Sequence, residues 1–252
     1  MSNQELSGKV ALITGASKGL GKAMAFALAQ AGCRVALVSR DEALLEKVRE
    51  ELAASGGAAD VYRADVTKED EVARLAGEVP SRSGPVQILI NNAGINIRKN
   101  LTEFTLAEWQ SVMDTNLTSV FLLCRAFVPG MRGTGYGRIL NMTSIMAHVS
   151  LPGRAAYSSS KTALLGLTRA LALELATEGI TVNGISPGPF ATDMNLPLIN
   201  NPEANAQFLA SIPVGRWGQV KEIGELARYL CSEDAGFITG TDILIDGGWC
   251  AR

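Results

Sequence analysis

The stretch Lys9-Val10-Ala11-Leu12-Ile13-Thr14-Gly15-Ala16-Ser17-Lys18-Gly19-Leu20-Gly21 joins a short apolar run to a turn that contains three glycines. The apolar run predicts a β-strand that is buried on both faces, and residues 22–31 have a helical pattern. Glycines let the backbone turn tightly and approach a pyrophosphate, whose charge would lie at the helix N-terminus. Strand, glycine turn and helix in this order favour a dinucleotide site. The spacing is GxxxGxG rather than GxGxxG, so an ordinary glycine-rich turn is the alternative.

A second apolar run, residues 34–38, ends at Ser39-Arg40-Asp41. In dinucleotide-binding folds an acidic residue at this strand end selects a free ribose 2′-hydroxyl, whereas an arginine accommodates a 2′-phosphate. Arg40, with Lys18 of the glycine turn as a second cation, therefore predicts that NADP(H) is preferred over NAD(H). The alternative is that Arg40 is a solvated surface charge and that Asp41 caps the next helix.

Strands and helices are expected to alternate along the rest of the chain, which predicts an α/β fold. Further strands are expected at residues 58–64 and 86–90, in the apolar part of 138–144, and at 242–246. Helices are expected at residues 41–54, 68–79, 106–131, 154–178 and 220–231, and a loop at 80–85. Asn116 is an unusual residue for the middle of a helix, and its simplest interpretation is a side chain bonded to backbone or water.

Tyr157 and Lys161 stand four residues apart in an Ala/Leu-rich helical stretch and therefore lie on one helix face. A lysine ammonium close to a phenol is expected to lower the pKa of the tyrosine, which could then exchange a proton near neutral pH. Ser144 follows an apolar run and would stand at the carboxyl end of a strand, where ligands bind in open parallel sheets. These three groups suit the polarisation and protonation of a carbonyl. Two surface residues at helical spacing are the alternative.

Composition limits the classes of function. At 252 residues the chain can form one domain with a full core, and 47% hydrophobic with 19% charged residues is ordinary for a soluble globular protein. A net charge of -2 without a basic block argues against nucleic acid or a membrane as partner. The four cysteines (Cys33, Cys124, Cys231 and Cys250) are far apart, so a metal site is not expected. The first eight residues are polar and show no signal peptide, and we expect a cytoplasmic protein.

Several motifs together resemble the short-chain dehydrogenase/reductase family: Thr14-Gly15-x-x-x-Gly19-x-Gly21, Asn91-Asn92-Ala93-Gly94, Asn116, Ser144, Tyr157-x-x-x-Lys161 and Pro187-Gly188. The similarity runs in order from about Lys9 to Asp246-Gly247-Gly248. It implies one Rossmann domain over residues 1–252, with a doubly wound, seven-stranded parallel sheet. It also implies a nicotinamide cofactor across the carboxyl edge of the sheet, a small carbonyl or alcohol as substrate, and a homotetramer.

The resemblance implies a role for each catalytic residue. Tyr157 would be the general acid in carbonyl reduction or the base in alcohol oxidation, and Lys161 would lower its pKa and hold the nicotinamide ribose. Ser144 would orient the substrate carbonyl, and Asn116 would hold a water that links Lys161 to solvent. The cofactor-binding residues expected from the motifs and the resemblance are Gly15, Ser17, Lys18, Gly19, Leu20, Gly21, Ser39, Arg40, Asp65, Val66, Asn92, Ala93, Gly94, Tyr157, Lys161, Pro187, Gly188 and Thr192.

Residues 189–211 contain several apolar side chains and three prolines without the period of a core helix, which predicts a helical substrate lid. The candidate substrate contacts near this segment are Asn96, Arg98, Met146, His148, Arg154 and Phe190. Arg98 and Arg154 could each bind a carboxylate or phosphate bidentately, the alternative being two surface charges. His148 is the single histidine, and a loop residue without a role is its alternative interpretation.

The substrate is less well defined by the sequence. Gly94-Ile95-x-Ile97-Arg98, Thr192-Asp193-Met194-Asn195, Arg216-Trp217-Gly218 and Asp246-Gly247-Gly248-Trp249 resemble the gluconate 5-dehydrogenase branch, which interconverts keto and hydroxy sugar acids. The general pattern is equally similar to 3-oxoacyl-[acyl-carrier-protein] reductases. We expect an NADP(H)-dependent oxidoreductase of a keto sugar acid or polyol, with a 3-oxoacyl thioester reductase as the alternative. A catalytically silent nucleotide-binding regulator is disfavoured, because Ser144, Tyr157 and Lys161 are all present.

Overall fold

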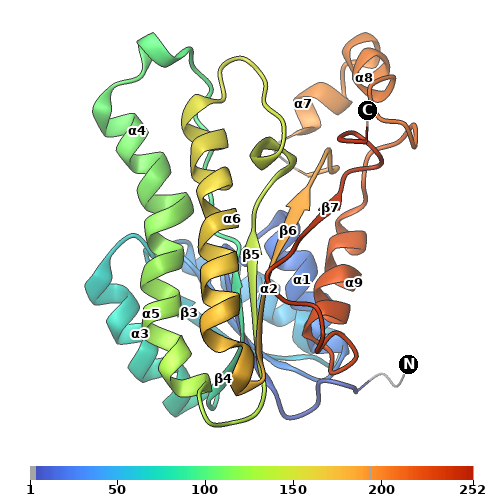
Figure 1. The fold of residues 1–252 in the computed structure, drawn as a ribbon. Helices are drawn as coiled ribbons and strands as arrows, with labels where there is room; N and C mark the ends of the chain where they lie inside the picture. The colour runs from blue at the N-terminus through green and yellow to red at the C-terminus, as the bar shows by residue number, and fades with distance from the viewer. Residues whose placement is uncertain (1–3, 193–194, 252) are drawn as a thin grey trace.

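The computed structural model describes residues 4–192 and 195–251 and contains one parallel sheet of seven strands (Figure 1). The strands are β1 (Val10–Thr14), β2 (Arg34–Ser39), β3 (Ala58–Arg63), β4 (Val86–Asn91), β5 (Gly137–Met142), β6 (Ile180–Pro187) and β7 (Asp242–Ile245). Their order across the sheet is β3-β2-β1-β4-β5-β6-β7, and every neighbouring pair is parallel. The predicted seven-stranded, doubly wound Rossmann sheet is therefore confirmed.

Helices cover both faces of the sheet. One face carries α1 (Gly19–Gln30), α2 (Glu42–Ala54) and α9 (Val220–Cys231), and the other carries α3 (Glu69–Arg82), α4 (Leu106–Met113), α5 (Ser119–Met131) and α6 (Ala155–Leu175). Alternate strand residues enter two separate cores: Ala11 and Ile13 pack with α1, whereas Val10 and Leu12 pack with the helices of the opposite face. Both kinds of position are apolar because both faces are covered.

Three segments differ from the expected element boundaries. Helix α1 begins at Gly19 rather than Lys22, so two of the glycines lie in its first turn. The loop expected over residues 80–85 is wrong in its first half, because α3 continues through Pro80 to Arg82. Pro80 has no N–H to donate to the Ala76 carbonyl, and α3 ends two residues later at Arg82. The long helix expected over residues 106–131 is interrupted by a π-helical turn, η2 (Asp114–Thr118), with Asn116 at its centre.

Two short helices occupy the predicted lid segment: α7 (Leu196–Ile199) and α8 (Pro202–Leu209). They lie beyond the carboxyl ends of the strands, at the upper end of the molecule in Figure 1. The ring of Phe208 in α8 stacks on Trp217 with a centroid distance of 4.8 Å, and the Trp217 indole N–H donates to Asn205 Oδ1 at 2.8 Å. Side chains thus hold α8 to the segment before α9. Asp193 and Met194, part of the sugar-acid motif, lie outside the described residues.

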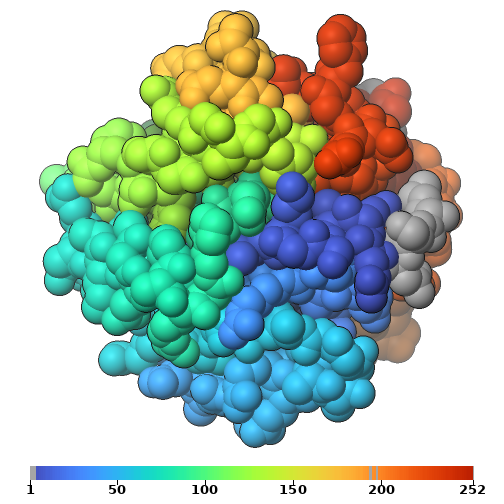
Figure 2. Space-filling view, turned by 90° about the horizontal axis from the view of Figure 1, so that it is seen from below, coloured from blue at the N-terminus to red at the C-terminus, as the bar shows by residue number. Residues whose placement is uncertain are grey.

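The opposite end of the molecule is built from the amino ends of the same strands. Figure 2 shows this end, with the dark-blue N-terminal segment above the light-blue part of the chain and to the right of the teal part. Within the described ranges, no helix combines the length and apolarity needed to cross a bilayer. Leu106 on α4 and Leu173 on α6 are 76% and 83% exposed. Such exposed leucines fit an association surface, but the homotetramer stays a prediction.

Candidate active site

A cleft of about 810 Å³ lies along the carboxyl edge of the sheet, where β1 and β4 are neighbours. The chain proceeds from β1 outward to β3, and then returns to β4 and continues in the other direction to β7. The helices that follow β1 and β4 therefore cover opposite faces, and a crevice remains between the two strand ends. Loops that follow β1, β2, β3, β4, β5 and β6 all contribute to its lining.

The glycine turn requires glycine at two positions for backbone conformation and at a third for space. Gly15 and Gly19 have φ angles of +64° and +56°, in the left-handed region that favours glycine. Gly21 has ordinary backbone, but a Cβ there would lie 2.3 Å from the carbonyl oxygen of Gly15. The first turn of α1 can therefore pack directly onto the loop, and its free N–H groups face the cleft as an anion site.

Side-chain hydrogen bonds join the ends of β1 and β4. Thr14 Oγ1 accepts the backbone N–H groups of Asn92 and Ala93, each at 3.0 Å. The Asn92 amide donates to the carbonyl oxygens of Thr14 at 2.8 Å and of Gly15 at 3.2 Å. Asn92 thus holds the glycine turn in place, in addition to lining the cleft.

The tip of β2 forms the far end of the cleft. Asp41 Oδ1 accepts the Leu44 N–H at 3.0 Å and so caps α2, as one interpretation expected. Arg40 is exposed and lines the cleft, and its charge reaches Asp65. Although burial raises it, the pKa of Asp65 lies below its usual value, because Thr67 donates two hydrogen bonds and Arg40 adds positive charge.

Every residue predicted to bind the cofactor lines this cleft. The glycine cradle, the N-terminus of α1, the cation at the tip of β2 and the Tyr157–Lys161 pair occur in order along it. This donor set fits a dinucleotide: backbone N–H groups for the pyrophosphate at one point, and a cation for a ribose phosphate at the far end.

Lys161 is the most deeply buried cation of the site. Its side chain extends from α6, is 4% exposed, and donates a hydrogen bond from Nζ to the carbonyl oxygen of Met142 at 2.5 Å. Burial lowers the pKa of Lys161 to about 8, because a low-dielectric environment disfavours the charged form. The ammonium can therefore lose its proton at a moderately alkaline pH.

Tyr157 lies one helical turn before Lys161, with the Lys161 Nζ 5.8 Å from the centre of its ring. Burial raises the pKa of Tyr157, while the Ser144 hydroxyl and the charge of Arg154 lower it. The direction is opposite to the expected one, because desolvation outweighs these groups and the Lys161 ammonium is directed to Met142. Tyr157 consequently keeps its proton at neutral pH.

Ser144 follows β5 and begins the short 3₁₀ turn η3 (Ile145–Ala147), where its Oγ accepts the Met146 N–H at 3.1 Å. Asn116 is fully buried in the π-helical turn. Its Oδ1 accepts the Ile95 N–H at 2.8 Å, and its Nδ2 donates to Ile95 O and Ser160 Oγ, both at 3.0 Å. The side chain therefore ties the loop after β4 to α6. Its predicted role in a water relay stays a prediction.

The six candidate substrate residues differ in their position relative to the cleft. Asn96 and Phe190 line it, whereas Arg98, Arg154, His148 and the buried Met146 are outside its lining. Arg154, at the start of α6, is partly buried beside Tyr157 and Arg98: burial and the Arg98 charge lower its pKa, and Tyr157 raises it. His148 is outside the cleft lining, and its Nε2 lies 2.6 Å from Asp242 Oδ2.

Two positions at or next to the cleft were not predicted from the sequence. Thr143 lines the cleft beside Ser144, and its hydroxyl contacts Asp242 of β7. The sequence signal for Thr143 was its place between an apolar strand and Ser144, but nothing local in the sequence marks Asp242 as its partner. Among the described residues, no group of three or more His, Cys, Asp or Glu side chains could hold a metal ion.

The chain matches known proteins over nearly its whole length. Residues 15–250 match a family model described as enoyl-(acyl carrier protein) reductase. The chain is 37% identical to gluconate 5-dehydrogenase of Gluconobacter oxydans over 243 residues, which are 96% of this chain and 95% of that protein. It is 40% identical to 3-oxoacyl-[acyl-carrier-protein] reductase of Synechocystis over 245 residues, 96% of this chain and 97% of that one.

Solved structures show the same architecture. A crystal structure described as a gluconate dehydrogenase of Agrobacterium tumefaciens superposes with a TM-score of 0.95 at 39% identity, covering 98% of both chains. A second, described as an NAD(P)-dependent gluconate 5-dehydrogenase of Beutenbergia cavernae with bound NADP at low occupancy, gives a TM-score of 0.92 at 36% identity and covers 98% of both chains.

The buried ammonium of Lys161 should make the protein less stable at neutral than at alkaline pH. Its folded pKa of about 8 lies below the usual 10.5. Between these values the unfolded chain holds a proton that the folded chain has released, so the free energy of unfolding rises with pH. The free-energy cost of burying the charged Lys161 side chain is present in full below pH 8 and disappears as the pH approaches 10.5.

We expect the free energy of unfolding of the wild type, relative to Lys161→Met, to increase by about 2 kcal/mol between about pH 7 and pH 10. Denaturant unfolding at both pH values measures it. Lys221→Met is the control, because Lys221 is exposed on α9 and should show no such increase. A difference between wild type and Lys161→Met that is constant with pH would contradict the burial of a charged lysine.

Proposed function

Since the chain belongs to the short-chain dehydrogenase/reductase family, and is thus an oxidoreductase of alcohol and carbonyl groups, we propose that it interconverts a keto sugar acid and its hydroxy acid. NADP(H) is the proposed cofactor. Tyr157 is the proposed acid in reduction and the base in oxidation. The proposal selects one substrate class within a family that also contains thioester reductases.

The observation that supports an acidic substrate is the pair Arg98 and Arg154. Arg154 Nη1 is buried and has no hydrogen-bond partner among the described residues, and neither arginine forms an ion pair there. A buried N–H without an acceptor is costly. A partly buried cation beside a like charge is costly too: burial, and then the charge of Arg98, lowers the pKa of Arg154. A carboxylate can accept bidentate hydrogen bonds and relieve both costs. Asn96 Oδ1, also buried without a partner, can accept from a sugar hydroxyl.

The protein side of the reaction follows from the geometry. In reduction the Ser144 hydroxyl donates a hydrogen bond to the substrate carbonyl oxygen, and Tyr157 then transfers its proton to the same oxygen. The raised pKa of Tyr157 keeps this proton available at neutral pH. The nearby Lys161 ammonium stabilises the phenolate that results. A bound nicotinamide supplies or accepts the hydride, and in oxidation the proton moves from the substrate hydroxyl to Tyr157.

The preference for NADP(H) is supported by the charges at the tip of β2. Arg40 and Lys18 both line the far end of the cleft and are exposed. Asp41, the acidic residue nearest this tip, uses its carboxylate to cap α2. An acid that is occupied as a helix cap is poorly placed to select a ribose 2′-hydroxyl, whereas the two cations suit a 2′-phosphate.

A 3-oxoacyl thioester reductase is the second candidate, supported by the 40% identity to a protein of that name. NADPH oxidation with 5-keto-gluconate and with an acetoacetyl thioester, measured side by side, separates the two. We expect turnover of the keto acid. Turnover of the thioester alone would instead support the assignment as a 3-oxoacyl thioester reductase.

The same assay tests the arginine pair. Arg154→Gln should raise the KM for 5-keto-gluconate by about 10-fold or more, the value expected for losing hydrogen bonds to a charged group. A ketohexose carries CH₂OH in place of the carboxylate, and its KM should not change. Arg169→Gln, an exposed arginine farther along α6, is the matched control. Equal KM values for the acid in wild type and Arg154→Gln would remove Arg154 from the substrate site.

Tyr157→Phe tests the assignment of the acid. Loss of the hydroxyl should reduce kcat by about 100-fold or more, the usual contribution of a general acid, because no other group replaces the proton. The dissociation constant for NADPH should remain close to the wild-type value. Tyr229→Phe removes an exposed hydroxyl on α9 and should leave kcat unchanged. Wild-type kcat in Tyr157→Phe would require another acid.

Arg40→Asp tests the cofactor preference. The substitution replaces the favourable cation with a repulsive charge, so the KM for NADPH should rise by about 100-fold while that for NADH stays the same. Initial rates with each cofactor measure both constants. Arg63→Asp is the matched control, because it makes the same change of charge at the end of the adjacent strand β3, outside the cleft lining. If Arg40→Asp weakens both cofactors equally, Arg40 does not contact the 2′-phosphate.

A further inference from the structure

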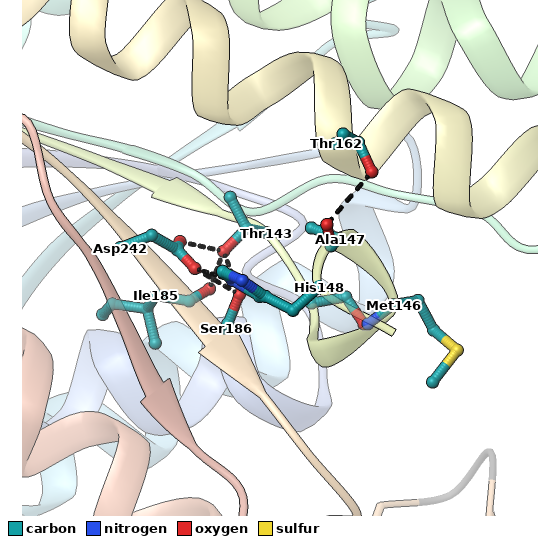
Figure 3. A network of polar contacts seen from close by, with 9 residues as sticks. Thr143, Met146, Ala147, His148, Thr162, Ile185, Ser186 and Asp242 are labelled. Carbon is teal, nitrogen blue, oxygen red and sulfur yellow. Dashed lines mark hydrogen bonds and ion pairs between the residues drawn. The ribbon is translucent and has the colours of Figure 1, made fainter. Parts of the chain in front are cut away.

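The carboxylate of Asp242 joins three strands behind the candidate active site. Asp242 is the first residue of the edge strand β7, and its side chain is 8% exposed. Oδ1 lies 2.5 Å from Thr143 Oγ1 after β5, and Oδ2 lies 2.6 Å from Ser186 Oγ on β6 and 2.6 Å from His148 Nε2. Figure 3 shows these side chains converging on the carboxylate.

The fold leaves space for this carboxylate. Gly184 is paired with Asp242 in the β6–β7 register. A Cβ at position 184 would lie 2.0 Å from Asp242 Oδ1, and its φ angle is not in the left-handed region. Glycine is therefore required there for space and not for conformation. The carboxylate passes over β6 at this glycine and reaches the end of β5, two strands from its own.

The hydrogen atoms of the network can all be assigned to an ionised Asp242. The single hydrogen of the Thr143 hydroxyl has two close acceptors, Asp242 Oδ1 at 2.5 Å and the carbonyl oxygen of Ile185 at 2.7 Å. Because that carbonyl oxygen already accepts the Thr143 N–H at 2.9 Å, the hydroxyl hydrogen can be assigned to Oδ1. The Ser186 hydroxyl and the His148 imidazole can both donate to Oδ2. Charge-assisted hydrogen bonds of this kind are stronger than neutral ones. Ser186 and Thr143 are both buried. Without the carboxylate, their hydroxyls would have only the Ile185 carbonyl oxygen and each other as acceptors.

The residues that are hydrogen-bonded to the carboxylate lie close in sequence to residues of the candidate active site. Thr143 directly precedes Ser144, and both line the cleft. Ser186 directly precedes Pro187 and Gly188, which also line the cleft. His148 follows the turn η3, whose N-terminus is capped by Ser144. The Thr162 hydroxyl of α6 donates to Ala147 O at 3.2 Å, which fixes the same turn to the helix of Tyr157 (Figure 3). Asp242 thus connects both sides of the reacting centre.

We propose that Asp242 is a positioning residue, which holds Ser144 and the Pro187–Gly188 turn in their working geometry. His148 closes this network from the solvent side. The inference rests on the proposed function in that it assumes carbonyl chemistry at Tyr157, but it does not depend on which carbonyl compound is the substrate. It gives His148 a role away from the substrate.

Asp242→Asn tests the proposal with little change of shape. The amide nitrogen would face groups that donate to the carboxylate, so Ser144 should move relative to Tyr157. We expect kcat to fall by about 10-fold to 100-fold, the cost of a small misplacement in an active site, with the KM for NADPH unchanged. Asp60→Asn is the matched control: Asp60 lies on the opposite edge strand β3 and also accepts from a hydroxyl, that of Ser83, and from a cation, Arg34. It should lose stability but keep kcat.

Conservative variants separate positioning from general stability. His148→Gln keeps an N–H donor and should retain more of kcat than His148→Ala. The thermal unfolding midpoints of the two variants are measured as well, to separate a loss of kcat from a loss of stability. If Asp242→Asn does not fold, Thr143→Val and Ser186→Ala each remove one arm of the network and should each lower kcat. Wild-type kcat in Asp242→Asn, or in both single-arm variants, would overturn the proposal. An equal fall of kcat in Asp60→Asn would also overturn it.

A readout without turnover distinguishes this inference from the proposed function. If the wild type reduces neither 5-keto-gluconate nor the acetoacetyl thioester, the proposed function fails, but the fluorescence of bound NADPH still reports the environment of its nicotinamide. A changed emission maximum in Asp242→Asn, with an unchanged one in Asp60→Asn, would support positioning of the Pro187–Gly188 turn. Identical emission in wild type and Asp242→Asn would overturn it.

Discussion

The hydroxyl of Thr14 joins the two strands between which the cleft opens, and the rest of the site depends on that junction. Helices depart to opposite faces after β1 and β4, so no helix covers the gap between the two strand ends. Thr14 Oγ1 accepts two backbone N–H groups of the β4 loop, and Asn92 donates back to the β1 loop. The crevice is thereby open to a ligand and still rigid. Asn116 then continues the connection from the β4 loop to α6.

Burial determines the electrostatics of the reacting groups. Desolvation keeps Tyr157 protonated and makes the Lys161 ammonium easier to neutralise, so the two pKa values move apart: that of Lys161 falls to about 8, and that of Tyr157 rises above its usual 10.0. Transfer of the phenol proton to a neutral Lys161 is therefore unfavourable, and the proton stays on Tyr157 for a substrate oxygen. The arrangement is costly for folding, and the hydrogen bond from Lys161 to Met142 compensates only in part.

The sequence predicts those features that depend on local pattern. The central strands are recognisable because both of their faces are apolar, and the glycine turn because Gly15, Gly19 and Gly21 stand between strand and helix. Strand β6 was not located, since Thr181, Asn183 and Ser186 alternate with its apolar residues, although all three are buried. The π-helical turn was not predicted, because it retains the helical period; Asn116 was noted only as an unusual residue within a continuous helix. Asp242 could not be found, because its partner Thr143 is 99 residues away and the contact exists only in the assembled sheet.

Charge is divided between the two sides of the candidate active site. The carboxylate of Asp242 is hydrogen-bonded to two hydroxyl groups and an imidazole, which occupy both of its oxygens. Neither Arg154, which lies close to Tyr157, nor the neighbouring Arg98 forms an ion pair with a described acid. The positive potential of the two arginines is therefore not cancelled by the nearest buried acid. In the proposed function, this separation would let one site contain a carboxylate for positioning and still attract an anionic substrate.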